Sequence, residues 1–181
     1  MKRNLAIICA VVIVFMIINI SYILYFFNRR NIILGYSPSG IPFYKNNKKE
    51  QIDNWVTMDN KKIYCGIKWQ CVEFARRYLI VTHGITFSDV TSAFQIPDAK
   101  FTTLDGKQNI EVRNNLQVGS LIVWPKNYMA NSVDGHVAVV SSITPNGITV
   151  VEQNYDNKNE INRFIRRDDM RNTTILTVEL N

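Results

Sequence analysis

The sequence predicts an α+β protein in which one amphipathic helix precedes an antiparallel β-sheet, after a single N-terminal membrane helix. Three observations predict it: an uncharged apolar run at 5–27, helical apolar spacing from Cys71, and four β-branched runs in the C-terminal half. The 181 residues suffice for one folded domain. We expect an anchor with basic flanks over 1–30, a linker and approach over 31–62, and the folded domain over 63–181.

The first expected element is the uncharged run from Leu5 to Phe27. At about 1.5 Å per residue, a helix over this run is roughly 34 Å long and could span a bilayer. A cleaved signal peptide fits less well, because the run is too long and bulky residues follow it where a cleavage site needs small ones. We therefore expect a single-pass membrane protein held in a lipid bilayer through 5–27. Its orientation stays open, since basic residues flank both ends.

The net charge of +6 does not indicate a nucleic-acid partner. Four of the 21 Lys and Arg residues flank the apolar run, and no acidic residue precedes Glu50. The flanking charges suit lipid headgroups, and the rest of the chain is close to neutral. No nucleic-acid partner is therefore expected.

The helix is expected to begin at Cys71, after the Asn-, Lys-, Gly- and Pro-rich segment 31–62, which predicts an irregular approach. Apolar residues recur at 71, 74, 75, 78 and 79, which is the spacing of one helix face. The opposite face would carry Glu73, Arg76 and Arg77. Gly84 is expected to end the helix.

The sheet is expected from four β-branched apolar runs, "SLIVWP" (120–125), "HVAVVSSI" (136–143), "GITVVEQN" (147–154) and "TTILTVEL" (173–180). Between the middle two, "TPNG" predicts a hairpin with a three-residue loop over 145–147. The order of one helix followed by an antiparallel sheet makes the fold α+β.

Two of the three cysteines, Cys65 and Cys71, lie near the start of the helix. Their spacing does not suit zinc, and with only two histidines in the chain a metal site is not expected. A disulfide between them would need an oxidising compartment. At the start of a helix, unpaired backbone N–H groups and the helix dipole favour a thiolate at Cys71 and could hold an oxyanion. Cys71 is thus a candidate nucleophile, with a buried core cysteine as the alternative.

The base for such a nucleophile would be His136. The other histidine, His83, lies roughly 18 Å from Cys71 along the helix, where it would only complement the helix dipole. His136 opens a strand at the rim of the sheet, and Glu152 and Asn154 on the next strand share its face. A three-residue hairpin loop would make Asn154 its diagonal neighbour, so geometry slightly favours Asn154 unless a bulge shifts the register toward Glu152.

The segments "GIKWQCVEFARRYL", "SLIVW", "DGHVAVV" and "VVEQN", in this order, resemble the CHAP family of papain-like cysteine amidohydrolases, most specifically its glutathionylspermidine amidase domains. The resemblance covers roughly 60–155. It implies a papain-like fold with the nucleophile at the N-terminus of a helix packed on an antiparallel sheet. It also implies Cys71 as nucleophile, His136 as general base and Glu152 as the residue that orients the histidine.

The same resemblance implies three further roles. Gln70 would lie near the oxyanion site and Asn154 would be accessory, while Arg76 would contact a substrate carboxylate. The alternative for Arg76 is an exposed helix arginine. No cofactor is implied.

The resulting hypothesis is a membrane-anchored cysteine amidase or peptidase that uses a Cys-His-Glu site. The resemblance favours glutathionylspermidine or a related γ-glutamyl peptide amide as substrate. An enzyme that cleaves peptidoglycan at a cell envelope is an alternative. Another is a non-catalytic membrane interaction module on the same scaffold, although such a module would not require the intact Cys, His and Glu or Asn set.

Overall fold

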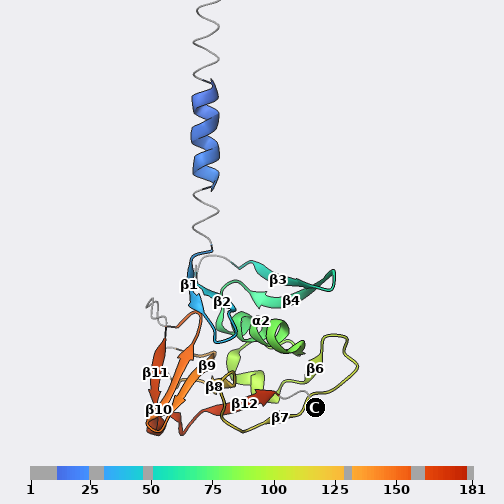
Figure 1. Cartoon of the computed structure of the whole chain (residues 1–181), viewed down its shortest axis with the longest axis vertical. Helices are drawn as coiled ribbons and strands as arrows, with labels where there is room; N and C mark the ends of the chain where they lie inside the picture. Colours follow the sequence, from blue (N-terminus) through green and yellow to red (C-terminus); the bar gives the residue numbers. More distant parts are fainter. Residues whose placement is uncertain (1–11, 25–30, 47–50, 129–131, 156–161, 179–181) are drawn as a thin grey trace, which may run out of the picture. The chain divides into compact units, whose positions relative to one another are not determined.

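The computed structural model describes residues 12–24, 31–46, 51–128, 132–155 and 162–178. The chain forms two units, Met1–Ile32 and Ile33–Asn181 (Figure 1).

In the first unit, residues 12–24 are helical and their apolar side chains are exposed. Among the described residues, no helix has the length and apolar character needed to cross a membrane. The rest of the predicted run, 5–11 and 25–27, lies outside the described residues. The prediction of a single-pass membrane protein, with a transmembrane helix over 5–27 and a lipid bilayer as partner, is therefore wrong.

The second unit is α+β (Figure 1). Its elements, in chain order, are β1 (Ile33–Tyr36), β2 (Pro42–Tyr44), β3 (Asp53–Met58), β4 (Lys61–Ile67), α2 (Cys71–His83), β5 (Ile85–Phe87), the 3₁₀ helix η1 (Ala93–Asp98), β6 (Phe101–Thr103), β7 (Val112–Arg113), β8 (Leu121–Trp124), β9 (His136–Thr144), β10 (Gly147–Val151), β11 (Arg163–Arg166), the 3₁₀ helix η2 (Arg167–Met170) and β12 (Thr174–Val178).

The main sheet has the strand order β11-β10-β9-β8-β12-β7, and its neighbouring strands are antiparallel. Side chains alternate across it, as the two-residue period of a strand requires. Val137 and Val139 pack in the larger core cluster with the apolar face of α2, whereas Ala138 and Val140 pack in a second cluster with Trp124. The sheet therefore has two buried faces, and α2 covers one of them.

Helix α2 has the predicted bounds. The apolar positions 71, 74, 75, 78 and 79 are all buried, and the helix ends at Gly84, whose φ of 65° is the left-handed conformation that glycine adopts at low cost. The opposite face is different from the prediction, because Glu73, Arg76 and Arg77 are also buried.

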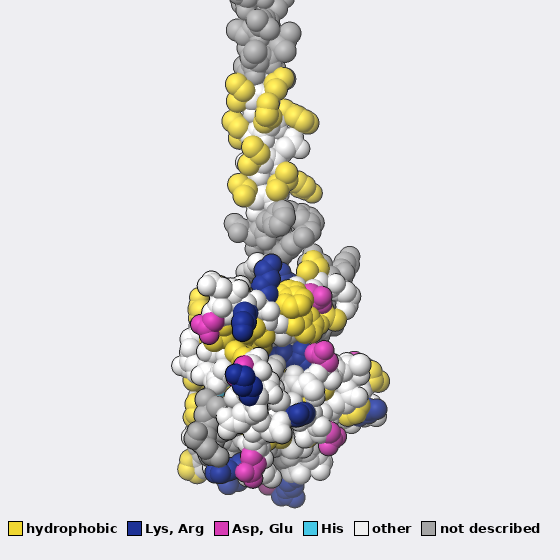
Figure 2. Space-filling model, turned by 90° about the vertical axis from the view of Figure 1, so that its right-hand side faces the viewer, with side chains coloured by type: hydrophobic (Ala, Val, Ile, Leu, Met, Phe, Trp, Pro, Cys, Tyr) yellow, Lys and Arg dark blue, Asp and Glu magenta, His cyan; other side chains and the backbone are white. Residues whose placement is uncertain are grey.

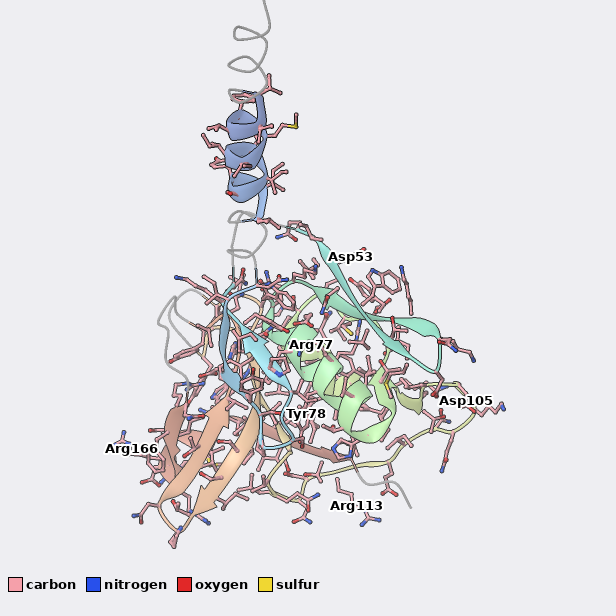
Figure 3. The ribbon with its side chains drawn as sticks, turned by 45° about the horizontal axis from the view of Figure 1, so that its top comes forward. Asp53, Arg77, Tyr78, Asp105, Arg113 and Arg166 are labelled. Atoms are coloured by element: carbon pink, nitrogen blue, oxygen red, sulfur yellow. The ribbon has the colours of Figure 1, made fainter. Side chains whose placement is uncertain are left out.

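The segment before α2 explains that burial. It was expected to be irregular, but it contains β1, β2 and β3, and the hairpins β1–β2 and β3–β4 form on it. Arg77 on α2 (Figure 3) donates to the backbone oxygen of Pro42 on β2. Asn54 on β3 donates to Glu73. The hairpins thus cover the charged face of α2, and Val81 is the one exposed residue of this helix.

The β9–β10 hairpin is tighter than predicted. Gly147 pairs with Thr144, which leaves a two-residue turn, and a bulge then shifts the register between Thr149 and Val150. After the bulge Val151 pairs with Val139, so the register continued past the end of β10 makes Glu152, rather than Asn154, the diagonal neighbour of His136.

On the face shown in Figure 2, basic and acidic side chains are interspersed beside a cluster of hydrophobic ones. No extended patch of one charge is visible on it, in keeping with a nearly neutral domain surface.

Candidate active site

Cys71 is the first residue of α2, and the extended residue Gln70 precedes it without capping the helix through its side chain. The first N–H groups of a helix have no partner within it, so those of this turn stay available to an anionic group. Cys71 is buried with 9% of its surface exposed. Cys65 and Cys71 are both free thiols, and burial raises the pKa of Cys65 to about 11.

His136 is the first residue of β9, directly after Gly135. Gly135 has a φ of +66°, and a Cβ there would lie 2.4 Å from the backbone oxygen of Trp124. Only glycine fits this close approach. It allows His136, the first residue of β9, to pair with Trp124, the last residue of β8. The imidazole is buried and packs near the rings of Trp124 and Tyr155.

Cys71, His136 and Glu152 follow one another in that order. Nε2 of His136 lies 2.7 Å from Oε2 of Glu152, and Cys71 lies near enough to the imidazole to act on its charge. Because Nε2 faces the carboxylate, Nδ1 is the nitrogen that remains for the sulfur. Burial by itself lowers the pKa of His136, but the charge and hydrogen bond of Cys71, together with Glu152, outweigh it and raise that pKa to about 9.

Glu152 has a second partner that the sequence did not indicate. Arg163 on β11 donates from Nε to Oε1 at 2.6 Å and from an Nη to Oε2 at 2.9 Å. Burial raises the pKa of Glu152, but the hydrogen bonds and charges of Arg163 and His136 outweigh it and the pKa is lowered. No motif in the sequence identified Arg163.

Gln70 and Asn154 contact each other. Nδ2 of Asn154 donates to Oε1 of Gln70. The oxygen of the Gln70 amide is thereby engaged, and its N–H₂ group is the part that can donate to another acceptor. The carboxylate that contacts the imidazole of His136 is that of Glu152. The two amides thus lie at the N-terminal end of α2, next to Cys71.

A cavity of about 500 Å³ opens at Cys71. Its lining includes Gln70, Tyr64, Arg76, Asp89 and Asp134, from β4, α2 and the loops after β5 and before β9. His136 and Glu152 do not line it, and each side chain is only 4% exposed. A molecule in this cavity would therefore meet the sulfur first.

Arg76 lies in the wall of this cavity and is only 3% exposed, so it is not the exposed helix arginine of the alternative prediction. One Nη donates to Asp89 at 2.9 Å, the other donates to the backbone oxygen of Ser88, and Nε is buried without a partner. Asp89 is 83% exposed, so the ion pair reaches solvent on one side only.

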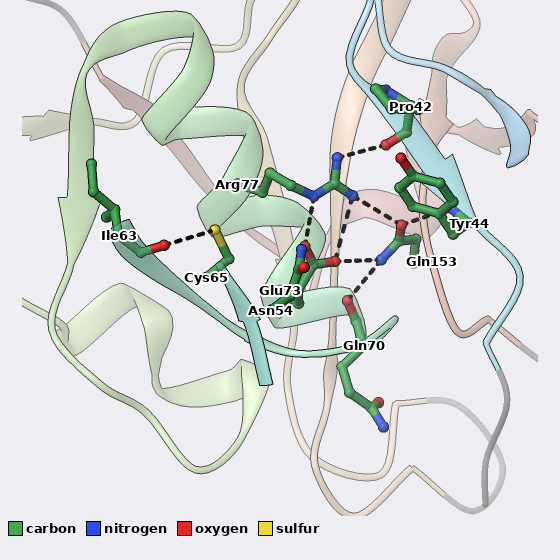
Figure 4. A network of polar contacts seen from close by, with 9 residues as sticks. All are labelled: Pro42, Tyr44, Asn54, Ile63, Cys65, Gln70, Glu73, Arg77 and Gln153. Atoms are coloured by element: carbon green, nitrogen blue, oxygen red, sulfur yellow. Dashed lines mark hydrogen bonds and ion pairs between the residues drawn. The ribbon is translucent and has the colours of Figure 1, made fainter. Parts of the chain in front are cut away.

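A buried polar network fixes the segment that carries Glu152 and Asn154 (Figure 4). Gln153 donates to Oε2 of Glu73 and to the backbone oxygen of Gln70, while its Oε1 accepts from Arg77 and from the backbone N–H of Tyr44. Glu73 and Arg77 form an ion pair at 2.6 Å, one turn apart on α2. The network therefore joins the start of α2 to the residue between the two site residues.

His83 lies at the other end of α2, away from this site. It is half-buried, and burial lowers its pKa. Within the described ranges, no group of three or more His, Cys, Asp or Glu side chains is placed to hold a metal ion.

Residues 62–154, just over half of the chain, match the family model of the CHAP domain. The chain belongs to the CHAP family. This confirms the family that the sequence motifs indicated, and the match includes Cys71, His136 and Glu152.

Relatives of this chain have names that give an activity. The bifunctional glutathionylspermidine synthetase/amidase of Escherichia coli (strain K12) is 33% identical over 138 residues, 67% of this chain and 22% of that protein. The trypanothione synthetase of Crithidia fasciculata is 32% identical over 131 residues, 68% of this chain and 20% of that protein. The chain thus spans about a fifth of the length of these relatives. The family and the amidase among these relatives agree with the predicted enzyme class, an amide hydrolase.

Among solved structures, N-acetylmuramoyl-L-alanine amidase from Staphylococcus aureus matches with a TM-score of 0.49 and 17% identity, over 74% of this chain and 36% of that one. A match at this level does not discriminate between substrates.

Proposed function

We propose that this protein is a cysteine amide hydrolase whose catalytic residues are Cys71, His136 and Glu152. The observation that carries the proposal is the order of three groups: the sulfur in the cavity, the buried imidazole near it, and the buried carboxylate 2.7 Å from that imidazole. A domain with only a structural role would not need this arrangement, because burying three ionisable groups together is costly unless they are paired.

In the first step, Sγ of Cys71 attacks the carbonyl carbon of the amide and forms a tetrahedral intermediate. The backbone N–H groups at the start of α2 and the amide of Gln70 are the donors for its oxyanion. His136 then gives its proton to the nitrogen of the leaving amine, the C–N bond breaks, and an acyl-enzyme remains on Cys71.

In the second step, His136 takes a proton from water, which attacks the thioester carbonyl. The C–S bond breaks, the carboxylic acid leaves, and the thiolate–imidazolium pair is restored. Glu152 holds the imidazole through Nε2 in both steps, so that Nδ1 stays directed at the sulfur.

The substrate proposed is glutathionylspermidine or a related γ-glutamyl peptide amide, in line with the amidase among the relatives. Arg76 is the residue proposed to meet a substrate carboxylate, since it lines the cavity and carries a guanidinium, the group best suited to bind a carboxylate.

The test is to incubate the full chain and its Cys71→Ala variant with glutathionylspermidine and to measure free spermidine. We expect release that depends on Cys71. Equal release by both proteins would overturn the mechanism. No release from a protein whose Cys71 is nevertheless reactive would overturn this substrate and direct the search to peptidoglycan peptides.

A further inference from the structure

Arg163 lies outside the segment that carries the family signature. The family match ends at residue 154, and Arg163 is the first residue of β11, the edge strand of the main sheet. It pairs with Val150, so that Glu152, two residues beyond Val150, is its diagonal neighbour on the same face of the sheet.

The contact between Arg163 and Glu152 is bidentate and largely shielded from solvent. The two donor distances are 2.6 and 2.9 Å, and the side chains are 16% and 4% exposed. Planar two-point contact of this kind fixes the orientation of a carboxylate as well as its charge. Oε2 of Glu152, which accepts from Arg163, also faces Nε2 of His136.

Two aromatic rings hold Arg163 in place. Its guanidinium lies 4.8 Å from the ring centre of Trp124 and 4.0 Å from that of Tyr155. The same rings lie 5.7 and 5.5 Å from the imidazole of His136. They therefore exclude water from both partners of Glu152, which strengthens the charged contacts between them.

We propose that Arg163 is a positioning residue of the site: it keeps Glu152 ionised and fixed, and Glu152 in turn fixes His136 on Cys71. This inference rests on the proposed function. The ionisable groups around the carboxylate are His136 on β9 and Arg163 on β11, with Cys71 on α2 beyond the imidazole and with Tyr128 and Tyr155 beside the guanidinium.

Replacing Arg163 is expected to change the pH at which Cys71 loses its reactivity as the solution is made more acidic. Without Arg163, the buried carboxylate of Glu152 takes up a proton at higher pH, because burial favours its neutral form. A neutral Glu152 no longer stabilises the imidazolium. As the pH is lowered, the reactive thiolate–imidazolium pair therefore disappears at a higher pH than in the unmodified protein. The acid limb of Cys71 alkylation is the pH range in which its rate falls as the pH is lowered. We expect this limb to move up by about one pH unit or more, so that the rate at a given pH on the limb is roughly tenfold lower.

The experiment measures alkylation by iodoacetamide against pH in the full chain, with Cys71→Ala giving the background from the other cysteines. Arg163→Gln should shift the acid limb upward, and Arg163→Lys, which keeps the charge but not the two-point contact, should shift it less. The matched control is Arg166→Gln on the same strand, whose side chain is 74% exposed and paired with Asp169, and it should leave the limb unchanged (Figure 3).

An unmoved limb in folded Arg163→Gln overturns the inference, because a merely structural arginine would lower stability without moving it. If Arg163→Gln does not fold, an unmoved limb in Arg163→Lys overturns it equally. Absence of Cys71-dependent alkylation in the unmodified protein is a different result, and it overturns the proposed function itself.

Discussion

Nε2 of His136 lies 2.7 Å from Oε2 of Glu152, and both side chains are almost completely buried. Replacing Glu152 by Gln keeps the shape but removes the charge that supports the imidazolium. We expect the pKa of His136 to fall and amide hydrolysis to drop at least about tenfold. The control is Glu111→Gln, an exposed carboxylate on the loop before β7, which should leave the rate unchanged. A full rate in Glu152→Gln would remove Glu152 from the mechanism.

The two histidines are expected to titrate on opposite sides of the usual imidazole pKa of 6.5. Burial lowers the pKa of His83, whereas Cys71 and Glu152 outweigh burial and raise that of His136 to about 9. His136 should thus stay charged as the pH rises to about 9 and lose its proton above it. Proton NMR of the imidazole C–H signals measures both values, and His83→Asn assigns them.

Cys71→Ala should change only one of these titrations. Because the charge and the hydrogen bond of Cys71 are the strongest influences that raise the pKa of His136, removing the sulfur should lower it substantially. His83, at the other end of α2, should titrate as before. A His136 titration that does not move would mean that the sulfur and the imidazole are not in contact.

Much of this site follows from the sequence, and the parts that do not have physical reasons. The helix could be predicted because its apolar spacing and Gly84 are local signals. The burial of Glu73 and Arg77 could not, since it depends on hairpins whose strands are short and polar. The choice between Glu152 and Asn154 depended on a bulge, which no residue type specified. Arg163 was missed because its partner, Glu152, lies 11 residues earlier in the chain, after the end of β10.

The N-terminal run was predicted from its apolar composition, which is a strong local signal for a membrane helix. Among the described residues, no helix has the length and apolar character needed to cross a membrane. Composition gives the polarity of a segment and does not by itself make it a membrane span.

Gly135 is expected to be essential for the position of His136. In Gly135→Ala the new Cβ would meet the backbone oxygen of Trp124 at 2.4 Å, in addition to the cost of a φ of +66°. Gly106→Ala is the matched control, with a φ of +71° and open space around it. We expect about 1–2 kcal/mol of destabilisation at Gly106 from backbone strain alone, and about 1–3 kcal/mol more at Gly135 from overpacking. Denaturant unfolding measures both, and equal losses would contradict the close approach.

The ion pair of Glu73 and Arg77 is expected to be important for stability. Glu73→Gln leaves the buried guanidinium without its counter-charge, which typically costs about 3–5 kcal/mol of unfolding free energy. The exposed pair of Asp168 and Arg171 provides the comparison, since Asp168→Asn should cost less than about 1 kcal/mol. Urea unfolding distinguishes the two. Similar small losses would show that the network in Figure 4 contributes little to the fold.

The most direct test of the Cys71–His136 pair is the rate of iodoacetamide alkylation at pH 6 in the full chain, with each cysteine followed by peptide mass spectrometry. We expect rapid modification of Cys71, slow modification of Cys65, whose pKa burial raises to about 11, and a large loss of the Cys71 rate in His136→Asn. Equally slow modification of Cys71 and Cys65 at this pH, unaffected by His136→Asn, would show that Cys71 and His136 do not form a reactive pair.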